Sequence, residues 1–246
     1  MKRTAVIAIA ALALLGILAA GVVAGCGGGV ASDAVAKVGS ASVTKAQLQE
    51  LMAQAKAQTT SQGQTFPAEG STTYKSYTAM IVNYLVQSEV VAQSAGTFGV
   101  SVSDKQIADQ VAQIEKTYGG EAKLLPVLKQ QGMTMALLKK SLKSQMLAQA
   151  VAAKVVAKAS VSAAQIQSYW KAHAATLRKS KKTATFAKAK ATIRTTLLSQ
   201  AKSALWSAWL AQRTSELGVT YAAGYDPATL TSSPTPSVSA SATAGS

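Results

Sequence analysis

The sequence has few of the side chains that perform enzyme chemistry. Its 246 residues include one cysteine, Cys26, one histidine, His173, and ten carboxylates that are scattered without a cluster. A metal site needs several His, Cys or carboxylate ligands at characteristic spacing, and a nucleophile needs a base beside it. No such set is present, and His173 lies next to aromatic residues, where a packing or surface role is commoner than catalysis. We therefore expect no enzyme activity, no catalytic residue, and no metal or other cofactor.

Acidic residues are absent from a long stretch of the chain. Between Ala122 and Ser215 there are seventeen Lys and Arg and no Asp or Glu, and the whole chain has a formal net charge of +15. Such a basic stretch favours acidic partners, which include nucleic acid, anionic lipid headgroups and anionic cell-wall polymers. Its densest part, residues 168–190, has seven cations. We predict a basic surface there, formed by Lys179, Lys181 and Lys182.

The N-terminus has the pattern of an export signal. "MKR" is a short cationic start, and residues 5–24 form an uncharged run of small and apolar side chains. A run of about 20 such residues suits either a cleaved signal peptide or a membrane-spanning anchor. Both alternatives place the following chain outside the cytoplasmic membrane, so we expect no nucleic acid partner.

The residues after this run favour the cleaved alternative. "VAGCGGG" resembles the lipobox of bacterial lipoproteins, with Val23 at a position where that family more often has Leu. The resemblance implies that residues 1–25 are a signal peptide, that Cys26 receives a thioether-linked diacylglycerol, and that residues 26–33 are a flexible, Gly-rich tether. We therefore expect a lipid-anchored protein on the outer face of a bacterial cytoplasmic membrane.

The other end of the chain is poor in large apolar residues. Residues 231–246 consist mainly of Ser, Thr, Ala and Pro, and a segment of that composition cannot bury enough surface to fold. We predict a disordered tail over residues 226–246 and a folded, helical region over residues 34–225.

Three helix starts share a capping-box pattern, in which a Ser or Thr hydroxyl accepts from a backbone amide and a Gln three residues later reaches back. Successive boxes are 59 residues apart: Thr44 with Gln47, Ser103 with Gln106, and Ser162 with Gln165. The sequences between the boxes do not align, which favours independent helix starts over an internal repeat. Before the first box, "AVAKV" and "ASV" flank Gly39 and Ser40, which predicts a short β-hairpin.

Apolar residues at helical spacing follow each box and fill the segments between the boxes. The pattern indicates a mainly helical fold. Beyond the helices that start at the boxes, it predicts helices from about Tyr74 to Gly96, from Thr134 to Val155, from near Pro126, and from Thr185 to Leu217 with a stop at Gly218.

One of these helices carries a group of aromatic and sulfur side chains, which are Tyr74, Tyr77, Met80 and Tyr84. One interpretation is that they form the core-facing side of a helical domain. The other is that they line a partly open groove, since Tyr and Met can adapt to varied apolar partners. The sequence leaves both interpretations open.

Four segments occur in a distinctive order: "AVAKVGSASVTKAQLQELM", "QSAGTFGVSVSDKQIADQVAQI", "GMTMALLKKSLKSQMLAQAV" and "ASVSAAQIQSYWKAH". In this order they resemble extracytoplasmic foldases of the SurA/PrsA type, over roughly residues 34–175. The resemblance implies a mainly α, SurA N-terminal-like or trigger-factor-like helical chaperone body with a short β-hairpin near its N-terminus.

The sequence departs from that family at one place. In such foldases a parvulin prolyl-isomerase domain usually follows the fourth segment, and a domain of that kind needs on the order of 100 residues. Here eleven residues separate His173 from Thr185. The resemblance therefore implies that the parvulin domain is absent around residues 174–184, where we expect a short, Lys-rich and solvated junction between two helices.

The leading hypothesis is a membrane-tethered chaperone that binds unfolded, newly exported polypeptides (its clients) without catalysis. Its candidate client-binding residues are Tyr74, Tyr77, Met80 and Tyr84. An alternative is an adaptor lipoprotein that binds an anionic lipid surface or wall polymer through residues 122–215. A third alternative is an active peptidyl-prolyl isomerase.

Overall fold

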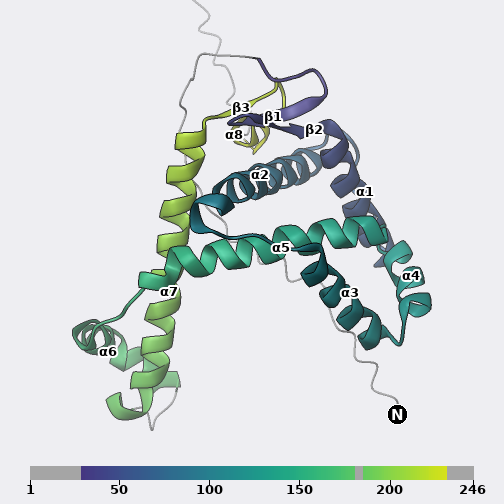
Figure 1. Cartoon of the computed structure of the whole chain (residues 1–246). Coiled ribbons are helices and arrows are strands. Elements are labelled where there is room, and N and C mark those ends of the chain that lie inside the picture. The colour runs from purple at the N-terminus through teal and green to yellow at the C-terminus, as the bar shows by residue number, and fades with distance from the viewer. Residues whose placement is uncertain (1–28, 181–184, 232–246) are drawn as a thin grey trace, which may run out of the picture.

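The computed structural model describes residues 29–180 and 185–231, which form a mainly helical body with one small sheet (Figure 1). The expected fold class is thus confirmed. The predicted hairpin is present as β1 (Ala34–Val38) and β2 (Ala41–Thr44), which pair antiparallel. Gly39 opens the two-residue turn with a φ of 56°, a conformation that side chains with a Cβ rarely adopt.

A third strand joins this sheet from the far end of the chain. β3 (Val219–Tyr221) pairs antiparallel with β1, so the strand order is β2-β1-β3. The sequence pattern missed β3, because three residues are too few to show the alternation of a strand. The sheet therefore fastens the C-terminal part of the chain to the N-terminal hairpin.

Helices account for most of the remaining described residues. In chain order they are α1 (Lys45–Ser61), α2 (Thr72–Ala95), α3 (Asp104–Tyr118), α4 (Glu121–Gln130), α5 (Met135–Val155), α6 (Ala163–Ser180), α7 (Phe186–Leu217) and α8 (Pro227–Thr231). Short 3₁₀ turns, Gly96–Phe98 and Val156–Lys158, follow α2 and α5. The stop expected after α7 is confirmed at Gly218, whose φ is 69°.

All three capping boxes form. At the start of α1 the Thr44 amide donates to Gln47 Oε1 over 2.8 Å, and the Gln47 amide donates to Thr44 Oγ1 over 3.2 Å. The same pair of bonds closes the first turns of α3 and α6. Each box satisfies amides that would otherwise have no partner, and so fixes where its helix begins.

The prediction for α4 was wrong at its start. The helix begins at Glu121 rather than near Pro126, and Pro126 lies inside it. The residue before the helix is Gly120, with a φ of 109° and no side-chain cap, so the sequence has no capping signal there. Pro126 has no backbone N–H to donate to the carbonyl of Ala122, four residues earlier. Ala122 is exposed, so water can donate to that carbonyl instead.

The predicted C-terminal boundary at residue 225 also needs correction. Residues 227–231 form α8, which packs against α2 beside the sheet (Figure 1). Leu230 is half-buried there. The first residues of the predicted tail thus belong to the folded body, while residues 232–246 lie outside the described residues.

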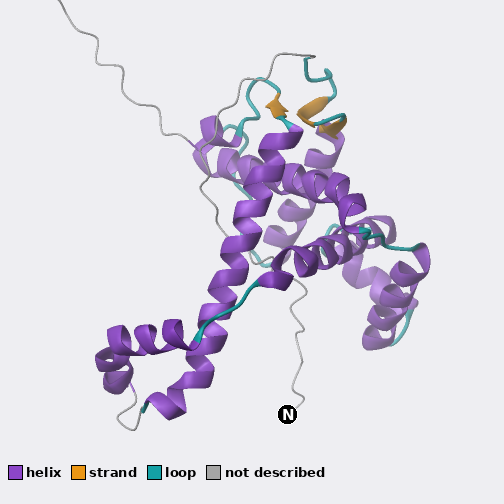
Figure 2. Cartoon of the chain, turned by 60° about the vertical axis from the view of Figure 1, so that its left-hand side comes forward, coloured by secondary structure: helices purple, strands orange, loops and turns teal. Residues whose placement is uncertain are grey.

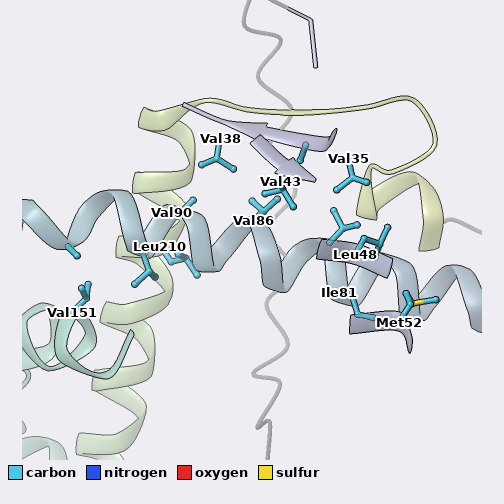
Figure 3. Packing of buried hydrophobic residues seen from close by; sticks show 14 residues of the cluster. Val35, Val38, Val43, Leu48, Met52, Ile81, Val86, Val90, Val151 and Leu210 are labelled. Atoms are coloured by element: carbon cyan, nitrogen blue, oxygen red, sulfur yellow. The ribbon is translucent and has the colours of Figure 1, made fainter. Parts of the chain in front are cut away.

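The core is built around α2, which lies under the sheet (Figure 3). Val86 and Val90 of α2 point toward Val38 and Val43 of the sheet. Three further helices add buried side chains to the same cluster: Leu48 and Met52 from α1, Val151 from α5, and Leu210 from α7. Each fully buried Val or Leu contributes about 1.5–3 kcal/mol. A smaller cluster of Leu124, Leu128 and Leu138 holds α4 to α5.

The long helix α7 extends beyond this core. It has 32 residues and is therefore about 48 Å long. Its C-terminal half packs on α2 and α5, and its N-terminal part continues past the body to meet α6 (Figures 1 and 2). We call α6 together with residues 186–198 of α7 the arm.

In the described ranges no single helix is long and apolar enough to cross a membrane. Two helical segments bent by 94°, Met135–Lys158 and Ala163–Lys179, together meet that requirement.

Candidate functional site

A cavity of about 180 Å³ opens between α1, α2 and α5. Its apolar lining comes from Val43, Leu51, Tyr84, Leu85, Ala92 and Leu137. Its polar lining comes from Gln47, Glu50, Ser88, Glu89, Lys140, Ser141 and Ser144. Pockets for drug-sized ligands usually measure about 300–1,000 Å³. The cavity therefore suits one or two side chains of a bound peptide better than a separate small molecule.

Two carboxylates give this cavity a negative wall in a basic protein. Glu50 Oε2 lies 3.4 Å from Lys140 Nζ, and both side chains remain about half exposed. Glu89 Oε1 accepts from Gln93 Nε2 over 3.0 Å, and the same nitrogen donates to the carbonyl of Val38 over 2.8 Å. The lining thus contains one cation and two carboxylates, which leaves a net negative charge beside an apolar surface.

A second hollow lies between α1 and α4 and is wide and open to solvent. Its volume is about 530 Å³, and it is lined by Ala53, Lys56, Ala57, Thr60, Ser61 and Gln130. The small alanine side chains let the loop after α4 approach closely. A Cβ on Gly132 would lie 2.6 Å from the Cβ of Ala57. The glycine therefore sets the distance between α1 and this loop.

The four candidate client-binding residues do not form one surface. Tyr74 and Tyr77 pack against Phe66, with ring centroids 6.3 and 5.3 Å away. Tyr84 instead lines the cavity, and Met80 points outward with 36% of its surface exposed. Ten residues in an α-helix turn the side chain to about 80° short of three full turns, so Tyr84 faces a different neighbour from Tyr74.

The Tyr74–Tyr77 end of α2 is part of the packed body. Burial raises the pKa of the Tyr74 hydroxyl, and the nearby Glu69 carboxylate and Tyr225 raise it further. Both tyrosines pack against the main core cluster. The core-facing interpretation thus describes Tyr74 and Tyr77, and the groove interpretation describes Tyr84.

The other predicted site residues are dispersed. Lys179 is exposed near the end of α6, within the arm. Lys181, Lys182 and Cys26 lie outside the described residues. His173 is exposed on α6, with its ring centroid 4.2 Å from that of Tyr169. Over residues 29–180 and 185–231, no three His, Cys, Asp or Glu side chains are grouped so that they could hold a metal ion.

Tyr84 is the cavity residue that the sequence analysis had named as a candidate, and the other lining residues were missed. On α2 the lining residues are Tyr84, Leu85, Ser88, Glu89 and Ala92, which follow helical spacing. The same spacing appears on α5, at Leu137, Lys140, Ser141 and Ser144. Each stripe mixes polar with apolar residues, so a count of apolar periodicity passes over it. A search for mixed stripes on neighbouring helices would have found this signal.

A comparison with known protein families identifies the family of this helical body. The SurA-like N-terminal domain matches residues 1–152, which is more than half of the chain. The chain belongs to the SurA-like N-terminal domain family. The matched part of this SurA-like protein includes the β1–β2 hairpin, α1 to α4 and most of α5, and so all three helices around the cavity. The family is of the chaperone type, and no curated protein matches the chain.

Proposed function

We propose that this SurA-like protein is an extracytoplasmic, lipid-anchored chaperone that binds segments of unfolded exported polypeptides without catalysis. The observation that carries the proposal is the cavity between α1, α2 and α5, which lies within the family match. Its lining offers an apolar surface beside hydrogen-bonding side chains, so it can take side chains of different kinds. A chaperone needs such tolerance because unfolded clients share no sequence.

The lipid anchor belongs to the same proposal. It rests on the resemblance of "VAGCGGG" to a lipobox and on the run of small and apolar residues before it. Acylated Cys26 would hold the body on the outer face of the cytoplasmic membrane, where newly exported chains emerge. Replacing Cys26 with Ser should abolish labelling by a radioactive fatty acid and release the protein from the membrane fraction. A Cys26→Ser protein that stays membrane-bound and is processed at the same point would contradict the anchor.

The absence of catalysis is part of the proposal as well. Lowering the barrier to prolyl isomerisation, which is about 18–20 kcal/mol, needs a pocket that holds the ring and twists the amide. The sequence between α6 and α7 is too short for a parvulin domain, since α6 ends at Ser180 and α7 begins at Phe186. We expect the protein to leave the rate of cis–trans conversion in a proline-containing peptide unchanged.

A cavity-filling variant tests the binding site. Ser144 of α5 lines the cavity, whereas the adjacent Gln145 is exposed and does not. The chain from residue 27 onward should slow aggregation of a chemically unfolded client, and Ser144→Phe should reduce this protection by at least threefold. Gln145→Phe adds the same ring outside the cavity and should protect as well as the unmodified chain.

The two variants need a check of folding before they are compared. Circular dichroism and thermal unfolding should show the same helix content for both. If Ser144→Phe folds normally and protects as well as Gln145→Phe, the cavity is not the client site. If the unmodified chain gives no protection, the chaperone function itself is wrong.

A further inference from the structure

The arm has exposed cations on both of its helices. They are Lys171, Arg178 and Lys179 on α6, and Lys188, Lys190 and Arg194 on α7. The sequence from Ala122 to Ser215 has no Asp or Glu that could balance them. The ion pairs found in the described part of the chain join Lys105 to Asp109, Lys140 to Glu50, and Arg213 to Glu216. None of these involves a cation of the arm.

Apart from Arg178, which lies over the Trp170 ring, these cations make no ion pair or ring contact among the described residues that holds the arm together. The two arm helices meet through Ile166 and Ile193, which are each 3% exposed, and through the rings of Trp170 and Phe186, 6.1 Å apart. Positive charges without acidic partners repel one another, and this repulsion opposes compact packing. The arm therefore keeps a concentration of charge that its own fold does not require, which points to an external anionic partner.

Aromatic side chains accompany the cations. Tyr169 and Trp170 are half-buried on α6, and the guanidinium carbon of Arg178 lies 5.5 Å from the centre of the Trp170 ring. Trp and Tyr together with Lys and Arg are enriched where proteins meet the headgroup region of a bilayer, because these side chains have an apolar body and a polar end. A soluble polyanion would use the charges but would gain less from the aromatic rings.

We propose that the arm is a docking surface for an anionic lipid membrane. Basic residues near an anionic bilayer each strengthen binding by roughly fivefold, and the effect disappears within a Debye length. A diacylglycerol on Cys26 supplies two acyl chains, which suffice for stable attachment, so the arm serves to orient the body at the bilayer rather than to attach it. The docking surface does not depend on client binding, and it lies outside the family match.

The position of the arm sets the orientation of the body. The sheet and the arm lie at opposite ends of α7 in both views (Figures 1 and 2). Residues 26–33 reach at most about 28 Å when fully extended, whereas α7 is about 48 Å long. A chain held at Cys26 can therefore bring the arm to the bilayer only if α7 is strongly tilted toward the membrane surface rather than upright.

Two variants with equal charge changes test this docking. In the arm variant Lys171, Lys179, Lys188 and Lys190 become Gln. In the control the same change is made at four exposed body lysines, Lys56, Lys75, Lys129 and Lys139. For the unlipidated chain from residue 27 onward, sedimentation with vesicles of phosphatidylcholine and phosphatidylglycerol in a 7:3 ratio should show about 600-fold weaker binding in the arm variant, because four contributions of about fivefold are lost. The control should lose less than about fivefold, and pure phosphatidylcholine vesicles should bind neither.

Two further measurements distinguish binding to a membrane from binding to other anionic partners. Lipids with brominated acyl chains should quench part of the tryptophan fluorescence of the bound chain, and Trp170→Phe should remove that quenching. An equal loss of vesicle binding in both charge variants would overturn the proposal, because the binding would then follow net charge alone. Arm-dependent binding to long-chain inorganic polyphosphate without binding to anionic vesicles would also overturn it, in favour of a soluble polyanion.

Discussion

Arg213 of α7 donates its Nε hydrogen to the hydroxyl of Ser94 on α2 over 3.2 Å. Ser94 is fully buried, and its hydroxyl donates in turn to the carbonyl of Val90 over 2.7 Å. The side chain of Arg213 remains 26% exposed and also pairs with Glu216. This contact joins residues 119 positions apart and holds the C-terminal end of α7 against α2.

A double-mutant cycle measures this contact. Ser94→Ala and Arg213→Leu should each lower the free energy of unfolding. The pair should show a coupling of about 1.5–3 kcal/mol, since a hydrogen bond to a charged group is worth about that much. Urea unfolding of the four proteins checks the value. Effects that simply add would mean that the contact does not hold α7 in place.

Gly132 should tolerate substitution worse than other glycines with positive φ. Its φ is 65°, and an added Cβ would lie 2.6 Å from Ala57 Cβ, so Gly132→Ala adds a steric overlap to the backbone strain. Gly70 is the matched control, because its φ is 80° but nothing lies within 4 Å of an added Cβ. Gly70→Ala should cost about 1–2 kcal/mol, and Gly132→Ala about 1–3 kcal/mol more. Equal losses in chemical denaturation would show that α1 and the loop can move apart freely.

The short helix α8 should contribute to stability, although the sequence placed it in a disordered tail. Ending the chain after Thr231 should leave the thermal midpoint unchanged. Ending it after Tyr225 removes the contact of α8 with α2 and should lower the midpoint by several degrees, since each kcal/mol corresponds to about 2–4 °C in a protein of this size. Equal midpoints for the two truncations, measured by circular dichroism, would show that α8 packs too weakly to matter.

The ionisation of Tyr221 should make the fold sensitive to alkali. Burial raises the pKa of Tyr221 above its ordinary value of 10.0, and the Asp226 carboxylate adds to the rise. The folded state therefore holds this proton more tightly than the unfolded state. The stabilisation is complete below pH 10 and is lost as the pH rises through the pKa of the folded state. Tyr221→Phe should reduce the fall in unfolding free energy between pH 9 and pH 11, and an unchanged slope would contradict the assignment.

Local signals in the sequence predicted much of the fold. The capping boxes at Thr44, Ser103 and Ser162 fixed three helix starts, because a cap needs only residues within one turn. Gly39 with Ser40 marked the hairpin for the same reason. The elements that were not predicted depend on contacts between distant parts of the chain, or begin without a capping residue. β3 is defined by its pairing with β1 across most of the chain, and the start of α4 follows Gly120, which has no capping side chain.

Less of the candidate site than of the fold could be predicted from the sequence. The tyrosine group on α2 was visible, but which member meets a cavity depends on the helices that pack around it. Tyr74 meets Phe66, whereas Tyr84 meets α1 and α5. Glu50 and Glu89 come together only because α1 crosses α2, and spacing within one helix cannot reveal such a pair.

The most direct test of the chaperone account compares one client in two states. The affinity of the chain from residue 27 onward is measured for a reduced, carboxymethylated polypeptide and for the same polypeptide in its native form, at 0.05 and 0.5 M NaCl. The account predicts binding of the unfolded form only, with an affinity that changes less than about tenfold between the two salt concentrations, because capture of apolar segments is weakly screened. Equal affinity for both forms, or binding that falls by several orders of magnitude with salt as counterion-driven binding does, would contradict the account and favour a polyanion-binding adaptor.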